Sequence, residues 1–226
     1  MTLSAVVFDL DGLMFDTEAL FHRVATELLA ERGRSFTPEI MNAMIGRRPH
    51  EAGLALKTLS GIEESVEEWL DLVRARFALL VDHAVGPTPG LLRLLDWLEG
   101  RAPLAVATSA NRTYARGLLE RHALAERFEF VLAAEDVTRG KPDPEVYATA
   151  ALRLGVPAGA MLVLEDSPAG VESARRAGAF VAAVPHAQSP AHALRHAHLV
   201  VPTLDDPELL DLLGRRLSIR PGSPSP

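Results

Sequence analysis

The stretch VVFDLDG at residues 6–12 decides the fold of this chain, because an apolar run of strand character ends there in two acidic residues, Asp9 and Asp11. Asp-Gly after such a run is an ordinary turn signal. In an open α/β sheet, however, ligands bind beyond the carboxyl ends of the parallel strands. Whether the pair marks a turn or a site therefore depends on what the rest of the chain places beside it.

Short aliphatic runs alternate with helical patterns along most of the chain. The runs that predict strands lie at residues 5–8, 104–107, 130–132, 161–164, 180–184 and 199–201. Apolar residues three and four apart predict helices at residues 91–98, 114–123, 145–154 and 170–177. Strands and helices in turn indicate an α/β fold, with a doubly wound, Rossmann-like parallel sheet covered by helices on both faces.

The alternation stops between residues 16 and 82, where no strand pattern is found. Leu20, Val24 and Leu28 recur at every fourth position, as on the buried face of a helix. The segment VGPTPG that follows, at residues 85–90, reads as a linker. The sequence thus predicts an all-helical cap inserted after the first strand. The expected organisation is an α/β catalytic core at residues 1–15 and 83–219, a helical cap at 16–82 and a disordered tail at 220–226.

Composition limits the classes of function. The chain has 226 residues, 48% of them hydrophobic, which suits one sizeable core with a smaller lobe. Its net charge is 23 − 30 = −7 without a Lys/Arg block, which argues against nucleic acid or an anionic membrane as partner. Zero cysteines exclude disulfides and thiolate metal sites, and no apolar run approaches the roughly 18 residues of a membrane span. We expect a cytoplasmic protein, monomeric or weakly dimeric.

Polar residues follow the other predicted strands as well. They are Thr108 and Ser109 in VATSAN, Lys141 in RGKPDPE, and Glu165 and Asp166 in VLEDSPAG. Some of these segments also have a structural interpretation, because Asn111 and Ser167 are good helix N-caps. Helix capping does not explain why four polar clusters come to the same edge of one sheet. Their common location predicts an active site there.

The residue types in these clusters fit phosphoryl transfer through a carboxylate nucleophile. Asp9, Asp11 and Asp166 crowd together, and two like charges about 4 Å apart repel by about 4 kcal/mol at an effective dielectric of 20. A cation must therefore share the site. Because the ligands are oxygens without Cys or His, the expected ion is Mg²⁺.

Each residue then has a distinct task. Asp9 attacks phosphorus and forms an aspartyl phosphate. Lys141, together with Thr108 and Ser109, holds the phosphate oxygens. Asp11 points to the same side as Asp9 if the strand continues, where it protonates the leaving alkoxide and later deprotonates water.

The motifs DLDG, ATSAN, GKPDPE and LEDSPAG occur here in one order, and with them the chain resembles the haloacid dehalogenase superfamily, in its phosphatase and β-phosphoglucomutase-like branch. The resemblance spans roughly Ser4 to Asp206. It implies that Asp9 is the nucleophile and Asp11 the acid/base, and that the cap is a mobile lid. The implied metal set is Asp9, Asp11 through its carbonyl, Asp166, and Glu165 directly or through water. The implied phosphate binders are Thr108, Ser109, Asn111 and Lys141.

The resemblance leaves a phosphomutase open as an alternative to a phosphatase. In β-phosphoglucomutase the pattern places a cap His where this chain has Phe21, with His22 next to it, and a cap Arg where this chain has Pro49. One residue on a helix is a rotation of about 100°, so we expect His22 on a solvated face and a hydrolase rather than a mutase. Candidate substrate contacts from the cap are Glu18, Arg47 and Arg48.

A receiver-type phospho-signalling module is a more remote alternative. In that fold the acidic pair is adjacent and the phosphorylated Asp lies on a later strand, and a long helical insert has no place. The expected function is therefore a Mg²⁺-dependent phosphomonoesterase acting on a small phosphorylated metabolite, with a sugar phosphate as the best guess.

Overall fold

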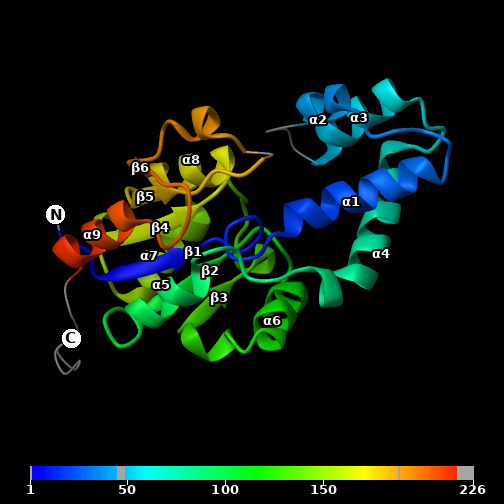
Figure 1. The fold of residues 1–226 in the computed structure, drawn as a ribbon. Coiled ribbons are helices and arrows are strands. Elements are labelled where there is room, and N and C mark those ends of the chain that lie inside the picture. Colours follow the sequence, from blue (N-terminus) through cyan, green and yellow to red (C-terminus); the bar gives the residue numbers. More distant parts are fainter. Residues whose placement is uncertain (1, 45–48, 188, 218–226) are drawn as a thin grey trace. The chain divides into compact units, whose positions relative to one another are not determined.

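The computed structural model describes residues 2–44, 49–187 and 189–217. The chain divides into two compact units, one made of Met1–Phe15 with Gly86–Pro226 and the other of Asp16–Val85. Figure 1 shows the elements of both units along the chain. Among the helices described, none combines the length and apolar character needed to cross a bilayer. The expected tail at 220–226 lies outside the described residues.

A parallel sheet forms the first unit, with strand order β3-β2-β1-β4-β5-β6 within the described residues. The strands are β1 (Ala5–Phe8), β2 (Leu104–Ala107), β3 (Phe130–Leu132), β4 (Met161–Glu165), β5 (Phe180–Ala183) and β6 (Leu199–Val200). Phe8 of β1 lies opposite Val106 on one side and Leu164 on the other. The chain reverses its direction of travel across the sheet at β1. The predicted α/β fold is confirmed, and β1 is the switch point at which such sheets bind ligands.

Helices complete the first unit. They are α5 (Leu91–Leu98), α6 (Arg112–Arg121), α7 (Glu145–Leu154), α8 (Pro168–Arg176) and α9 (Pro207–Arg216), with short 3-10 turns at Ala125–Arg127, Ala134–Asp136, Ala158–Ala160 and Ala191–Leu194. Both α6 and α8 begin two residues before the predicted positions, because Asn111 and Ser167 cap them. Residues Val7 and Val163 of the sheet share one buried cluster with Tyr147 of α7 and Val171 of α8. Two residues after Val7 and Val163, the chain reaches Asp9, just past the end of β1, and Glu165, the last residue of β4.

The second unit is all-helical. Its elements are α1 (Thr17–Ala30), α2 (Pro38–Met44), α3 (Pro49–Ser60) and α4 (Val66–Ala84). The predicted stripe of Leu20, Val24 and Leu28 is buried. Ser65 and Glu68 form a reciprocal capping box that starts α4.

Helix α4 continues to Ala84, two residues past the boundary expected from the sequence at residue 82. The linker that follows is anchored to the first unit. Thr88 donates from its backbone N–H to the Met14 carbonyl (2.9 Å) and from its hydroxyl to the Leu13 carbonyl (2.5 Å). Within the first unit, the segment that leads into the helical insert and the segment that follows it are therefore hydrogen-bonded to each other.

Candidate functional site

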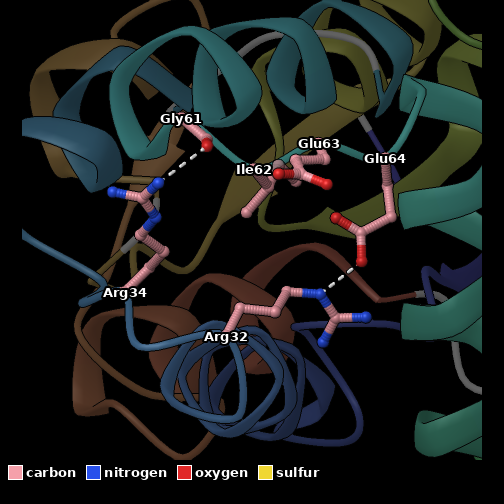
Figure 2. A pocket seen from close by; sticks show the side chains of 6 residues that line it. All are labelled: Arg32, Arg34, Gly61, Ile62, Glu63 and Glu64. Atoms are coloured by element: carbon pink, nitrogen blue, oxygen red, sulfur yellow. Dashed lines mark hydrogen bonds and ion pairs between the residues drawn. The ribbon is translucent and has the colours of Figure 1, made fainter.

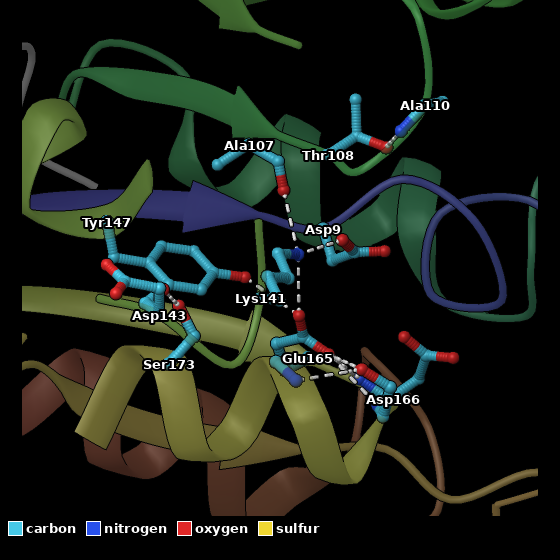
Figure 3. A network of polar contacts seen from close by, with 12 residues as sticks. Asp9, Ala107, Thr108, Ala110, Lys141, Asp143, Tyr147, Glu165, Asp166 and Ser173 are labelled. Carbon is cyan, nitrogen blue, oxygen red and sulfur yellow. Dashed lines mark hydrogen bonds and ion pairs between the residues drawn. The ribbon is translucent and has the colours of Figure 1, made fainter. Parts of the chain in front are cut away.

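The nucleophile predicted from the sequence lies one residue past the end of β1. The backbone N–H of Asp9 donates to the Leu164 carbonyl of β4 at 3.0 Å, and only 7% of the residue is exposed. Glu165 ends β4, and Thr108 follows β2. The register of the sheet thus brings three of the predicted polar clusters to one edge, as Figure 3 shows.

Lys141 joins these strand ends. Its Nζ donates to Asp9 Oδ1, to Glu165 Oε1 at 2.7 Å and to the Ala107 carbonyl at 3.1 Å. Figure 3 shows the amino group between the two carboxylates. Burial opposes the charged form of Lys141, but the carboxylates of Asp9 and Glu165 outweigh it and raise the pKa well above its usual value. Lys141 is therefore a buried cation in contact with Asp9.

Glu165 has a different set of partners from the one expected. It is fully buried, and its Oε1 accepts from Lys141 and from the Tyr147 hydroxyl (2.8 Å). Its Oε2 accepts from the backbone N–H groups of Asp166 and Ser167, each at 2.9 Å, and from the Ser167 hydroxyl. Burial works against ionisation, yet Lys141 and these donors hold the pKa of Glu165 below its ordinary value. Both oxygens are engaged with protein donors, and Oε1 supports Lys141.

Asp9 and Asp166 show the opposite electrostatic behaviour. Burial raises the pKa of Asp9 well above its usual range against the effect of Lys141, and the carboxylates of Glu165 and Asp166 add to the rise. Burial, together with Glu165, raises the pKa of Asp166 to about 7. This happens although His186 Nε2 lies 2.9 Å from Asp166 Oδ2. The site holds more buried negative charge than Lys141 alone compensates.

That excess of negative charge fits a divalent cation. Asp9, Glu165 and Asp166 carry three buried carboxyl groups against one buried lysine. In the part of the chain that the structure describes, no three His, Cys, Asp or Glu side chains form a metal cluster by themselves. A cation here would depend on Asp9, Asp166, a backbone carbonyl, waters and substrate oxygens. Such a mixed oxygen set is what Mg²⁺ prefers.

Asp11 is held in a way the sequence did not predict. The strand does not continue to Asp11, because β1 ends at Phe8 and Gly12 takes a left-handed conformation (φ 82°). The Tyr114 hydroxyl donates to Asp11 Oδ1 at 2.8 Å. Strand alternation therefore does not set the direction of the Asp11 side chain, and a contact with α6 holds one of its oxygens.

The predicted phosphate binders fall into two groups. Thr108 is buried and Ser109 is exposed, and with Lys141 they line a pocket of about 160 Å³. Thr108 Oγ1 accepts from the Ala110 N–H at 3.0 Å, which fixes its orientation. Asn111 instead caps α6, because its Oδ1 accepts from the Tyr114 N–H at 2.9 Å. Helix capping therefore accounts for Asn111.

The cap residues are only partly described. Arg47 and Arg48, and the side chain of Glu18, lie outside the described residues. Phe21 stacks on Phe77 with ring centroids 4.0 Å apart. The prediction of a solvated face for His22 was wrong, because its half-buried ring meets Phe36 edge-on at 4.7 Å.

The helical unit has a pocket of about 560 Å³, shown in Figure 2. Its lining residues are Arg32, Arg34, Gly61, Ile62, Glu63 and Glu64. Arg32 pairs with Glu64, and Arg34 donates to the Gly61 carbonyl at 3.2 Å. None of the predicted site residues that the structure describes lines this pocket, and two of its charged side chains, Arg32 and Glu64, pair with each other.

Sequence reasoning missed three residues of the site. Tyr114, Tyr147 and His186 contact Asp11, Glu165 and Asp166 respectively. His186 was recoverable, because it lies just after the run at residues 180–184 and so near the same edge of the sheet. The two tyrosines lie on helices, where an aromatic residue gives no separate signal of a polar contact.

Comparison with known proteins agrees with this geometry. The family model for haloacid dehalogenase-like hydrolases matches residues 6–184. The validoxylamine A 7'-phosphate phosphatase of Streptomyces hygroscopicus subsp. limoneus is 35% identical over 175 residues, covering 77% of this chain and 82% of the relative. The phosphorylated carbohydrates phosphatase of Thermotoga maritima is 30% identical over 177 residues, covering 78% and 82%. A haloacid dehalogenase family hydrolase of Deinococcus radiodurans R1, solved with bound phosphate and sodium, has a TM-score of 0.81 at 26% identity, covering 97% of this chain and 99% of that one.

The chain belongs to the haloacid dehalogenase-like hydrolase family. The predicted class of enzyme, a phosphoric monoester hydrolase, is confirmed. Membership of this enzyme family also argues against the alternative of a receiver-type signalling module.

Proposed function

We propose that this protein is a Mg²⁺-dependent phosphatase of small phosphorylated metabolites, with sugar phosphates as the preferred class, and that the reaction passes through a phosphoryl group on Asp9. The observation that carries the proposal is the buried Lys141 between Asp9 and Glu165 at the carboxyl edge of the sheet. The two curated relatives described above are named as phosphatases of validoxylamine A 7'-phosphate and of phosphorylated carbohydrates, which supports the substrate class.

In the first half-reaction, Asp9 attacks the phosphorus of the substrate. A bond forms between an Asp9 carboxylate oxygen and phosphorus as the bond to the leaving oxygen breaks. Lys141, with the Thr108 hydroxyl and Ser109, binds the phosphoryl oxygens, on which charge spreads in the transition state. Glu165 keeps Lys141 in place, so the lysine needs no reorganisation at the moment of reaction.

Asp11 moves the protons. It donates a proton to the leaving alkoxide, and in the second half-reaction it takes one from the water that attacks phosphorus and frees Asp9. Asp9, Asp166 and the backbone carbonyl of Asp11 would hold the Mg²⁺. When bound, the metal shields the incoming phosphate from the carboxylates and polarises its oxygens.

Hydrolysis is favoured over phosphomutation by the structure of the cap helix. The position of the mutase histidine is occupied by Phe21, whose ring is stacked on Phe77 inside the helical unit. His22 next to it is in contact with Phe36. Because both rings pack against other aromatic rings of the helical unit, neither takes the part of the mutase histidine, which couples sugar binding to the position of Asp11. Water can therefore attack the phosphorylated Asp9 before a second sugar binds.

A screen of phosphorylated metabolites for released phosphate tests the proposal. With Mg²⁺, we expect turnover of sugar phosphates by the native enzyme and none by Asp9→Asn. Phosphorus NMR on β-glucose 1-phosphate with a trace of the 1,6-bisphosphate separates the alternatives. Steady release of inorganic phosphate is the expected result, whereas rapid conversion to glucose 6-phosphate without free phosphate would establish a mutase.

A further inference from the structure

The hydrogen bond between Tyr114 and Asp11 joins α6 to the loop after β1. The Tyr114 hydroxyl lies 2.8 Å from Asp11 Oδ1, although the two residues are 103 positions apart in sequence. Both belong to the sheet unit. The contact is therefore built into the core and does not depend on the helical unit.

The start of α6 is fixed at three points, which places Tyr114. Asn111 Oδ1 caps the Tyr114 N–H at 2.9 Å. The Arg112 N–H donates to Glu135 Oε2 at 3.0 Å, and the Arg112 side chain pairs with Asp136 at 2.7 Å. A hydroxyl at the end of a rigid aromatic ring in this first turn has little freedom of position.

Asp11, by contrast, lies on a segment that the sheet does not hold. β1 ends three residues earlier at Phe8, and the chain turns at Gly12. A carboxylate that must meet the leaving oxygen needs a fixed orientation, because small displacements of a catalytic group are costly. The structure supplies the required contact from α6.

We infer that Tyr114 is a positioning residue for Asp11, an inference that rests on the proposed function. The hydroxyl donates to Asp11 Oδ1 and so fixes the orientation of the carboxyl group that carries the catalytic proton. That proton passes to the leaving oxygen as its bond to phosphorus breaks, and the electron pair of that bond stays on the leaving oxygen. Asn111 acts one step further away, by holding the turn from which Tyr114 projects.

The inference predicts a loss that depends on the leaving group. An alkoxide needs a proton as it departs, whereas p-nitrophenolate does not. Tyr114→Phe removes one hydroxyl and keeps the ring. We expect kcat/KM, which reports the steps up to departure of the leaving group and not the later attack of water, to fall about tenfold for an alkyl phosphate and hardly at all for p-nitrophenyl phosphate. A merely structural role would lower both rates by the same factor. Thr113→Ala, at an exposed neighbouring position, is the matched control.

Variants of Asn111 separate capping from phosphate binding. Asn111→Ala should show the same leaving-group dependence as Tyr114→Phe, with a smaller loss. Asn111→Asp should recover most of that loss, because Asp caps a helix as well as Asn does. If Asn111 bound phosphate instead, the added charge of Asp would raise KM for both substrates and would overturn this part of the inference.

Asp11→Asn, measured in parallel, separates the positioning role of Tyr114 from the acid/base role of Asp11. Its kcat/KM should fall at least about a hundredfold for the alkyl ester and much less for the nitrophenyl ester. With that pattern present, equal losses or no loss in Tyr114→Phe would overturn the positioning role alone. In Asp11→Asn a further Tyr114→Phe change should have no effect, and an additive effect would also overturn it. Equal losses in Asp11→Asn on both esters would contradict the proposed acid/base itself.

Discussion

Lys141 and Asp166 show how the same burial produces opposite results at neighbouring residues. Lys141 keeps its charge because two carboxylates contact it, whereas burial raises the pKa of Asp166 to about 7 because its contact with His186 compensates only in part. A cation brought next to Asp9 and Asp166 is expected to favour their ionised forms. The electrostatics of these residues therefore fit the proposed metal site.

Gly12 is the residue at which space next to Asp166 is most limited. An added Cβ would lie 2.2 Å from Asp166 Oδ2, and Gly12 also has a positive φ of 82°. We predict that Gly12→Ala loses about 1 kcal/mol of stability through strain and on the order of a hundredfold in kcat/KM through displacement of Asp166.

Gly178→Ala is the control for that prediction. Gly178 has a similar φ of 86° but no atom within 4 Å of the added Cβ. The variant should lose similar stability in denaturant unfolding and keep full activity. Equal activity of the two variants would show that the space beside Asp166 is unimportant.

A crowded and an open glycine can also be compared within helices, at Gly170 of α8 and Gly117 of α6. In α8, a Cβ on Gly170 would lie 1.6 Å from Glu165 Oε1, whereas in α6 a Cβ on Gly117 meets only the end of Arg121 at 3.8 Å. Gly117→Ala should therefore stabilise the protein by about 0.5–1 kcal/mol. Gly170→Ala should destabilise it by about 3 kcal/mol or more, because Glu165 must move away from Lys141. Thermal unfolding of both variants checks the signs, and stabilisation by Gly170→Ala would contradict the packing described.

In the helical unit, the pair of Arg32 and Glu64 links the end of α1 to the start of α4. The hydrogen bond from Arg32 lowers the pKa of Glu64 below its ordinary value of 4.5. A lowered pKa means that the stabilisation is complete above about pH 4.5 and is lost as the pH falls through the folded-state value.

Glu64→Gln should therefore reduce the free energy of unfolding at pH 7 by up to about 1 kcal/mol, and by much less at pH 3. Glu63→Gln makes the same charge change one residue away, at an exposed position, and should have little effect at either pH. Urea unfolding at both pH values measures the differences, and a loss in Glu64→Gln that is as large at pH 3 as at pH 7 would contradict the assignment.

For the whole molecule, the sequence predicted the fold far better than the contacts within the site. Aliphatic runs mark buried parallel strands clearly, so β1 and β2 were predicted at their observed bounds. The catalytic edge followed from topology, because the carboxyl ends of parallel strands meet. Helix starts were displaced by two residues where a cap residue and proline precede the apolar pattern, as at Ser167.

What the sequence did not predict depends on contacts between distant residues. Glu165 was expected to bind metal directly or through water, and nothing in its motif reveals its contacts with Tyr147 and Lys141. The contact of Tyr114 with Asp11 likewise depends on the rotation of α6 about its axis. The cytoplasmic location and the monomeric or weakly dimeric state stay predictions.

The most direct test of the central proposal is to find the phosphoryl group on Asp9. The enzyme is mixed with Mg²⁺ and a sugar phosphate, quenched in acid within milliseconds, and digested for mass spectrometry. We predict that the peptide containing Asp9 gains the mass of one phosphoryl group in the native enzyme, that borohydride reduction converts Asp9 to homoserine, and that Asp9→Asn shows neither change. Rapid turnover with an unmodified Asp9, or with the phosphoryl group on another residue, would contradict the proposed mechanism.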